Sequence, residues 1–208
     1  MKQKISYVLV ALLLTTNMDI LERFNSFMSS RQPAQQEQRG GAVVTGKVQD
    51  KPAGLPVDYV DTVHFIESSR GKLMDAPTSS AKGHFQFIDS TWNAYVKKHN
   101  LDFKPEDRYD FDKSKKVFEL FTEDNVRVLR KGLDRDPTHT EKYMAHKLGP
   151  STAVRFMKAS PNATVDKIVG KAALRANRNV FFDEEGKPKR VKDVYKHFNN
   201  FFTQNNKK

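Results

Sequence analysis

Between Leu55 and Phe202, large apolar residues recur every three or four positions in a series of short segments. This spacing predicts amphipathic helices whose apolar faces pack together, because an α-helix completes one turn in about 3.6 residues. A short strand or extended segment is indicated only at His84–Phe87, where polar and apolar residues alternate. The pattern therefore predicts a mostly α-helical α+β domain with a very small β element.

The first predicted helix of this domain carries an acidic residue on its apolar face. Pro56 suits the first turn of a helix, and Gly71 supplies an end signal. Val60, Val63 and Glu67 fall on one face between these two residues. The carboxyl of Glu67 is therefore expected to point toward the apolar side of the helix.

The later helices have their own start and stop signals. Asp89 or Ser90 is the expected cap of a helix that buries Trp92. Thr138 and Glu141 form a capping-box pattern at the start of another helix. Further apolar stripes are expected over Val117–Gly132, Ala153–Lys158, Val165–Leu174 and Val191–Phe202.

The chain divides into four segments by composition. They are a signal-like or membrane-anchor segment at 1–17, a short amphipathic helix and flexible linker at 18–54, a single domain at 55–202, and a basic tail at 203–208. Lys2 and Lys4 precede the uncharged run Ile5–Leu14, which is typical of an export signal and shorter than the about 20 residues of a membrane span. We expect an exported, periplasmic or virion-associated protein, with membrane association through residues 1–17 left open.

The formal charge of +11 favours anionic partners. No nucleic-acid-binding motif accompanies this charge, so a specific nucleic-acid partner is not predicted. Cysteine is absent, and His99, His139 and His197 show no metal-ligand spacing. We therefore predict neither a metal nor a cofactor, and packing alone must hold the domain together.

Glu67 is the first candidate for chemistry. An apolar face and the negative end of a helix dipole both disfavour a carboxylate, so both are expected to raise the pKa of Glu67. A carboxylic acid that keeps its proton near neutral pH can protonate a leaving oxygen, as the cleavage of glycosidic bonds requires. The alternative is an exposed glutamate paired with Arg70, three residues later.

An ordered set of motifs resembles the soluble lytic transglycosylase family, a branch of the lysozyme-like superfamily. In that family a Glu-Ser pair ends a helix and a Gly-x-x-Gln segment follows, as Glu67-Ser68 and Gly83-x-x-Gln86 do here. The second family motif is similar to Tyr143–Pro150, and the closing segments of a phage and proteobacterial branch are similar to Ala173–Asn177 and Val191–Phe198. The resemblance covers about residues 55–202.

The resemblance implies a goose-type lysozyme or transglycosylase fold and a reaction with one catalytic carboxyl. Glu67 would protonate the oxygen between N-acetylmuramic acid and N-acetylglucosamine and then accept the proton of the muramoyl 6-hydroxyl, giving a 1,6-anhydro product. Peptidoglycan strands would be the substrate, and a phage virion or a cell-envelope machine the setting. The residues expected to bind substrate are Ser79, Ser80, Phe85, Gln86, Tyr143, His146 and Asn177.

The second motif departs from the family pattern at one position. Many members place a tyrosine there that contacts the catalytic glutamate, whereas this chain has His146. Tyr143, one helical turn earlier, is the nearby phenol. A histidine beside Glu67 would be expected to make activity depend on pH near neutrality.

Three other functions remain open. A hydrolytic muramidase would use Asp75 or Asp89 beside Glu67. A non-catalytic glycan-binding or virion structural protein could keep the same fold. A nucleic-acid-binding protein would rely on the positive charge and bind with a steep salt dependence.

Overall fold

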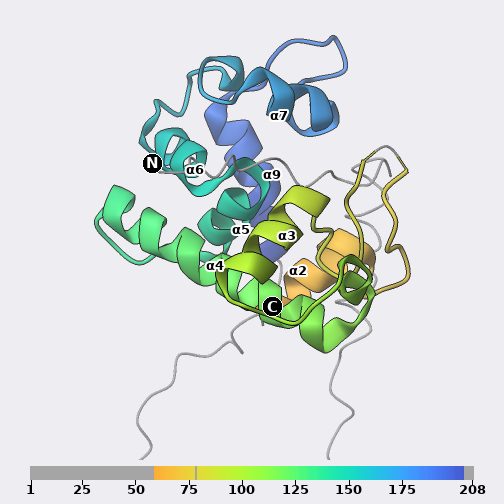
Figure 1. Ribbon diagram of the computed structural model, residues 1–208. Coiled ribbons are helices and arrows are strands. Elements are labelled where there is room, and N and C mark those ends of the chain that lie inside the picture. Colours follow the sequence, from red (N-terminus) through yellow and green to blue (C-terminus); the bar gives the residue numbers. More distant parts are fainter. Residues whose placement is uncertain (1–58, 78, 204–208) are drawn as a thin grey trace, which may run out of the picture.

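The computed structural model describes residues 59–77 and 79–203, and most of these residues are helical (Figure 1). The α-rich prediction is confirmed. The elements in chain order are α2 (Tyr59–Ser68), α3 (Asp89–Lys98), the 3-10 helix η1 (Pro105–Tyr109), α4 (Phe111–Leu133), α5 (His139–Leu148), α6 (Pro150–Lys158), the 3-10 helix η2 (Val165–Lys167), α7 (Lys171–Ala176), α8 (Arg178–Phe181) and α9 (Val191–Thr203).

The predicted strand at His84–Phe87 is wrong. Residues 83–86 form a turn, with Lys82 and Phe87 paired across it by a single bridge. The other pairings in the described residues are also bridges between single residues, so the expected β element is reduced to isolated bridges. Alternation failed as a strand signal here because Phe85, Gln86 and Phe87 are all buried on a turn.

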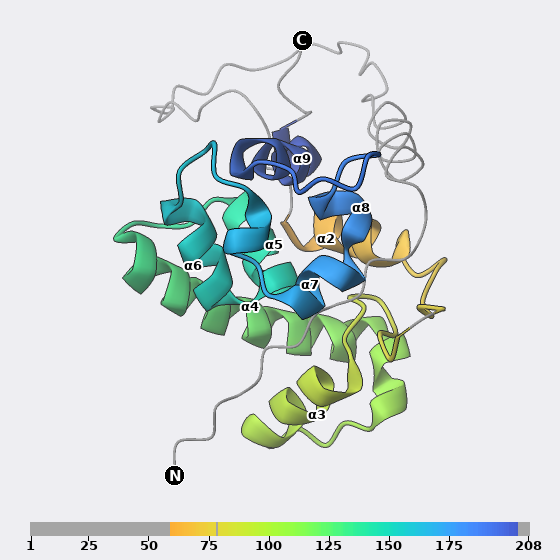
Figure 2. The same cartoon turned by 90° about the horizontal axis from the view of Figure 1, so that it is seen from above.

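The long helix α4 is the element on which α3, η1, α5 and α6 pack. Its N-cap, Asp110, accepts a hydrogen bond from the backbone N–H of Lys113 at 3.0 Å, and Asp134 ends the helix with φ of 56°. The predicted apolar stripe is confirmed, since Val117, Phe118, Phe121 and Leu129 are buried with Asn125 among them. In Figure 2, α4 crosses the molecule with α3 on one side and α5 and α6 on the other.

The capping box at the start of α5 is confirmed. The backbone N–H of Glu141 donates to Thr138 Oγ1 at 3.3 Å, and the N–H of Thr138 donates to the Glu141 carboxylate at 2.8 Å. Helix α5 ends at Gly149 as predicted, and Pro150 opens α6 directly. The short corner keeps α5 and α6 side by side on α4.

Two helix predictions need correction. Neither Asp89 nor Ser90 caps α3; the N-cap is Ile88, and Asp89 is the first helical residue. The stretch Val165–Leu174 is not one helix but η2 and the beginning of α7, separated by a break. In α9 the predicted apolar face is confirmed, and Phe201 belongs to it as well.

The interior is rich in stacked aromatic rings. Phe85 lies flat on Phe118 with a centroid distance of 4.3 Å. Trp92 is fully buried, as predicted, and its indole N–H donates to the carbonyl of Lys104 at 3.1 Å. Tyr143 packs edge-on against Phe198 of α9 at 5.8 Å. These rings and the buried Val63 and Ile66 of α2 belong to one apolar core, which spans α2, the turn after it, α3, α4, α5 and α9.

The segments predicted at 1–17 and 18–54 lie outside the described residues, as do residues 55–58 and 204–208. Within 59–77 and 79–203, no helix combines the length and the apolar character needed to cross a membrane. Helix α9 ends at Thr203, one residue beyond the predicted domain boundary.

Gly132 is a position where α4 packs closely against α6. A Cβ at Gly132 would lie 2.5 Å from Cγ2 of Val154. A helical Gly→Ala change ordinarily stabilises by about 1 kcal/mol, whereas overpacking costs about 1–3 kcal/mol. We expect Gly132→Ala to lower the free energy of unfolding, measured by urea denaturation.

The matched control is Gly170→Ala, because a Cβ at Gly170 meets nothing within 4 Å. This change should alter the unfolding free energy by less than about 1 kcal/mol. A Gly132→Ala protein at least as stable as the parent would contradict the close packing of α4 on α6.

Candidate functional site

Glu67 lies in the last turn of α2 and is 2% exposed. The helix ends just beyond it because Ser69 and Arg70 adopt left-handed backbone angles, with φ of 49° and 59°. The carboxyl points into the interior and meets α5, as its place on the apolar face predicted. The alternative of an exposed Glu67 paired with Arg70 is wrong, since Arg70 binds Asp61 at 2.6 Å.

Helix α5 presents three polar side chains to the Glu67 carboxyl. The hydroxyl of Tyr143 donates to Oε1 at 2.9 Å. One turn later, Nζ of Lys147 lies 3.2 Å from Oε1 and 3.4 Å from Oε2. Nε2 of His146 is 3.6 Å from Oε1, which is beyond hydrogen-bond distance. The side chains of Glu67, His146 and Lys147 are all 2% exposed or less.

Two opposing effects act on the protonation of Glu67. Burial raises the pKa of the Glu67 carboxyl above its usual value, because the interior disfavours the charged form. The ammonium of Lys147 and the hydroxyl of Tyr143 lower this pKa, and burial is the larger effect. The sequence predicted the direction of the shift, but it did not predict the opposing cation.

His146 does not act as the pH-dependent hydrogen-bond donor to Glu67 that the sequence predicted. Burial, together with nearby Lys147, holds the pKa of His146 well below 6.5, so the imidazole is neutral at neutral pH. Neither ring nitrogen has a hydrogen-bond partner among the described residues, and the ring packs edge-on against Phe118 and Phe121. Tyr143 makes the contact with Glu67 that the family pattern assigns to the aromatic position.

The Gly-x-x-Gln segment forms a tight turn beside α2. Gly83 has φ of 77°, and a Cβ there would lie 1.9 Å from the carbonyl oxygen of Arg108, so only glycine fits. The Gln86 amide donates to the carbonyls of Met74 and Gly83, each at 2.9 Å. Its Oε1 is buried with no partner among the described residues. In this conformation Gln86 therefore braces the turn.

Ser68 ties this turn to the end of α2. Its hydroxyl lies 2.9 Å from the carbonyl of His84 and 3.1 Å from that of His64, and it accepts the N–H of Gly71 at 3.0 Å. Phe85, in the same turn, is fully buried. The Glu-Ser pair thus has divided roles, with Glu67 facing α5 and Ser68 holding the neighbouring turn.

The other residues expected at the site form no hydrogen bond with the Glu67 carboxyl in the described part of the chain. Ser79 and Ser80 are exposed, and their hydroxyls accept backbone N–H groups of Ala81 and Asp89. Asn177 is buried between α7 and α8, where its amide donates to the carbonyl of Ala173 at 3.1 Å. Substrate contact by Ser79, Ser80, Phe85, Gln86 and Asn177 stays a prediction.

Neither proposed second carboxylate is paired with Glu67. Asp75 accepts a hydrogen bond from the hydroxyl of Tyr109, and Asp89 binds Arg108 at 2.7 Å. Both aspartates are exposed. In residues 59–77 and 79–203, no group of three or more histidine or acidic side chains is arranged to hold a metal ion.

Two important residues were missed at the level of sequence. Lys147 lies within the Tyr143–Pro150 motif, and its spacing of four from Tyr143 places both on one helix face, but this spacing does not by itself indicate a contact with Glu67. Arg108 is 3% exposed and donates to the carbonyls of Ser80 and Phe87, at 3.1 and 3.0 Å, so it holds both ends of the turn. No local pattern marks this role of Arg108, because Ser80 and Phe87 lie 28 and 21 residues earlier in the chain.

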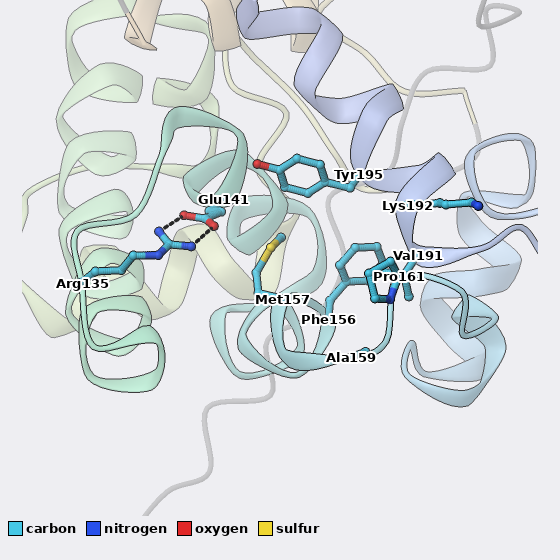
Figure 3. A pocket seen from close by; sticks show the side chains of 9 residues that line it. All are labelled: Arg135, Glu141, Phe156, Met157, Ala159, Pro161, Val191, Lys192 and Tyr195. Atoms are coloured by element: carbon cyan, nitrogen blue, oxygen red, sulfur yellow. Dashed lines mark hydrogen bonds and ion pairs between the residues drawn. The ribbon is translucent and has the colours of Figure 1, made fainter.

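A separate cavity of about 390 Å³ lies between α5, α6 and α9 (Figure 3). It is lined by Arg135, Glu141, Phe156, Met157, Ala159, Pro161, Val191, Lys192 and Tyr195. Arg135 and Glu141 form an ion pair at its edge, with nitrogen–oxygen distances of 2.6 and 2.8 Å. None of the residues that contact the Glu67 carboxyl lines this cavity.

No known protein-family model matches the chain.

The buried His146 gives stability a defined dependence on pH. Its folded pKa lies below the unfolded value of 6.5, so the stabilisation is present above pH 6.5 and is lost as the pH falls. We expect His146→Leu to lose less unfolding free energy than the parent between pH 7 and 5, with a difference in slope of up to about 1.4 kcal/mol per pH unit. Urea denaturation at several pH values measures this.

His197 on α9 supplies a comparison away from Glu67. Burial lowers the pKa of His197 to about 4, so His197→Leu should change the slope in the same direction. Parallel stability curves for the parent and His146→Leu would show that residue 146 gains its proton equally well in the folded protein.

Proposed function

We propose that this protein is a peptidoglycan lytic transglycosylase of lysozyme-like fold, with Glu67 as its single catalytic acid and base. One observation carries the proposal: a buried carboxyl with a raised pKa at the end of α2, bound by the Tyr143 hydroxyl. The resemblance of the ordered motifs around Glu67, Gln86 and Tyr143 supports it. The helix-rich architecture is compatible with the proposed fold.

The proposed reaction moves one proton from Glu67 and returns one to it. The neutral acid protonates the glycosidic oxygen, and the bond from this oxygen to the anomeric carbon of N-acetylmuramic acid breaks. The 6-hydroxyl oxygen of the same sugar then bonds to that carbon, and its proton passes to Glu67. The N-acetyl group of the substrate stabilises the positive charge that develops in between. Water is not consumed, and no second protein carboxylate is required.

Tyr143 gives the two carboxyl oxygens different tasks in this scheme. The phenol donates to Oε1 at 2.9 Å, whereas Oε2 has only the longer 3.4 Å contact with Nζ of Lys147 among the described residues, so we assign the transferred proton to Oε2. Burial raises the pKa of the Tyr143 hydroxyl well above its usual value, and the phenol therefore remains a donor throughout the reaction. The Glu67 side chain is 1% exposed, so the proposal includes an opening of the surrounding structure when a glycan strand binds.

The proposed setting follows from the sequence. Peptidoglycan is the partner, no cofactor is needed, and the protein acts outside the cytoplasm or in a virion. The phage-like closing motifs favour a virion protein that opens the cell wall during entry. A hydrolytic muramidase is less well supported, because Asp75 and Asp89 are engaged with Tyr109 and Arg108.

A second candidate function has one observation in its favour. The near-complete burial of the Glu67–Lys147 pair would also suit a non-catalytic protein in which these charges only join α2 to α5. In such a protein, a change at Glu67 would alter stability and leave glycan binding intact. Measurement of cleavage separates this candidate from the enzyme.

Glu67→Gln tests the proposed function. The amide retains the size of the side chain and can accept from Tyr143, but it has no acidic proton to transfer. We expect clearing of purified peptidoglycan in a zymogram to fall by about 100-fold or more, while circular dichroism shows a folded protein. Glu119→Gln, on an exposed part of α4, is the matched control and should clear like the parent.

Equal clearing by Glu67→Gln and the parent would remove Glu67 from the reaction. Analysis of the soluble products distinguishes the enzyme classes. A transglycosylase releases 1,6-anhydro-muropeptides, whereas a muramidase releases reducing ends.

A further inference from the structure

We infer that Lys147 is the positioning residue of the Glu67 carboxyl, whose two oxygens its ammonium group binds from the opposite helix. This inference rests on the proposed function, because it concerns how the same carboxyl performs its acid and base steps. Nothing in the sequence motifs assigned a role to Lys147. It follows from the arrangement of α2 and α5.

The ammonium group of Lys147 contacts both oxygens of the Glu67 carboxyl. Nζ of Lys147 lies 3.2 Å from Oε1 and 3.4 Å from Oε2, so the cation is near both oxygens instead of one. Tyr143, on the same face of α5 one turn earlier, binds Oε1 as well. Two anchors on one rigid helix fix the plane of the carboxyl and leave little rotation about its last bond.

Stability alone is a weak explanation for this lysine. Bringing an ammonium and a carboxylate into the interior has a large desolvation cost, and apolar side chains of similar size often serve the fold equally well. The Lys147 side chain is 2% exposed, so its charge cannot be shared with solvent. Its position is better explained by an effect on the carboxyl that it contacts.

That effect is electrostatic. Tyr59 from α2 itself and Tyr143, His146 and Lys147 from α5 are the titratable side chains that act on or face Glu67. Burial raises the pKa of both phenols, and the imidazole stays neutral, so these three carry no charge near neutral pH. Lys147 is therefore the charged neighbour of Glu67 in the described residues, and it opposes the effect of burial on the Glu67 pKa.

This opposition suits a group that must be an acid first and a base second. Without a nearby cation, burial would hold the proton on Glu67. The carboxyl would then be a weaker acid and would donate this proton less readily to the leaving oxygen. A nearby ammonium stabilises the carboxylate left after the first proton transfer. Lys147 thus balances the two protonation states that the single carboxyl uses in turn.

The test compares Lys147→Met, which removes the charge, with Lys147→Arg, which retains it. Activity requires protonated Glu67 in the free enzyme, so kcat/KM falls as the pH rises through the Glu67 pKa. We expect Lys147→Met to move this alkaline limb upward by about 1–3 pH units, because it removes an opposite charge in contact with the carboxyl. Lys147→Arg should leave the limb within about 0.5 unit of the parent.

The matched control is Lys116→Met on the exposed face of α4, which should show the parent profile. If Lys147→Met does not fold, Lys147→Gln provides the same comparison with a polar, uncharged side chain. If the charge of Lys147 did not act on the Glu67 carboxyl, Lys147→Met would change stability and total activity but leave the position of the alkaline limb unchanged.

A second readout does not depend on catalysis. The carboxyl carbon of Glu67, assigned in a carbon-13 spectrum by its absence in Glu67→Gln, titrates directly with pH. An upward shift of this titration in Lys147→Met supports the inference even if the parent cleaves no glycan, in which case the proposed function alone fails. An unchanged titration in a folded Lys147→Met protein overturns the inference, whatever the zymogram of Glu67→Gln shows.

Discussion

The contact between the end of α2 and the face of α5 is the interaction on which the interpretation of this protein depends. Glu67 brings a carboxyl into the apolar interior, where an ionised group is stable only with a partner. Tyr143 and Lys147 provide a hydroxyl and a cation at distances of 2.9 to 3.4 Å. Because both partners lie one turn apart on a single helix, any shift of α5 against α2 would break both contacts at once.

The surrounding structure serves to hold these two helices in register. Helix α4 supports α5 and α6, and the aromatic rings of Phe85 and Phe118 join the turn after α2 to α4. Arg108 and Ser68 fix that turn through backbone carbonyls, so its shape does not depend on exposed side chains. Gly149 ends α5 and Pro150 opens α6 directly, so the corner between these two helices is short. A carboxyl in such a frame keeps one orientation, which acid catalysis requires.

The burial of Glu67 has consequences for both candidate functions. A carboxyl shielded from water keeps its proton to a higher pH, which favours proton donation to a sugar oxygen. The same shielding separates it from any substrate in the conformation described, so catalysis would require local opening around a fixed acid. A non-catalytic protein would need no such opening. Cleavage of glycan by this protein would therefore require the chain around Glu67 to move.

The sequence by itself determined most of the helices, the capping box of α5 and the apolar faces of α4 and α9, because these depend on residues within a few positions of one another. It misplaced the cap of α3 and joined η2 to α7. It correctly placed Glu67 on a buried face, gave the direction of its pKa shift and identified Tyr143 as the nearby phenol. Its alternation wrongly predicted a strand where residues 83–86 form a turn, because long-range packing buries Phe85, Gln86 and Phe87 alike. Only the tertiary structure decided that Lys147 meets Glu67, since the two residues are 80 positions apart. A contact of that kind depends on how two helices pack across the core, and no local periodicity records it.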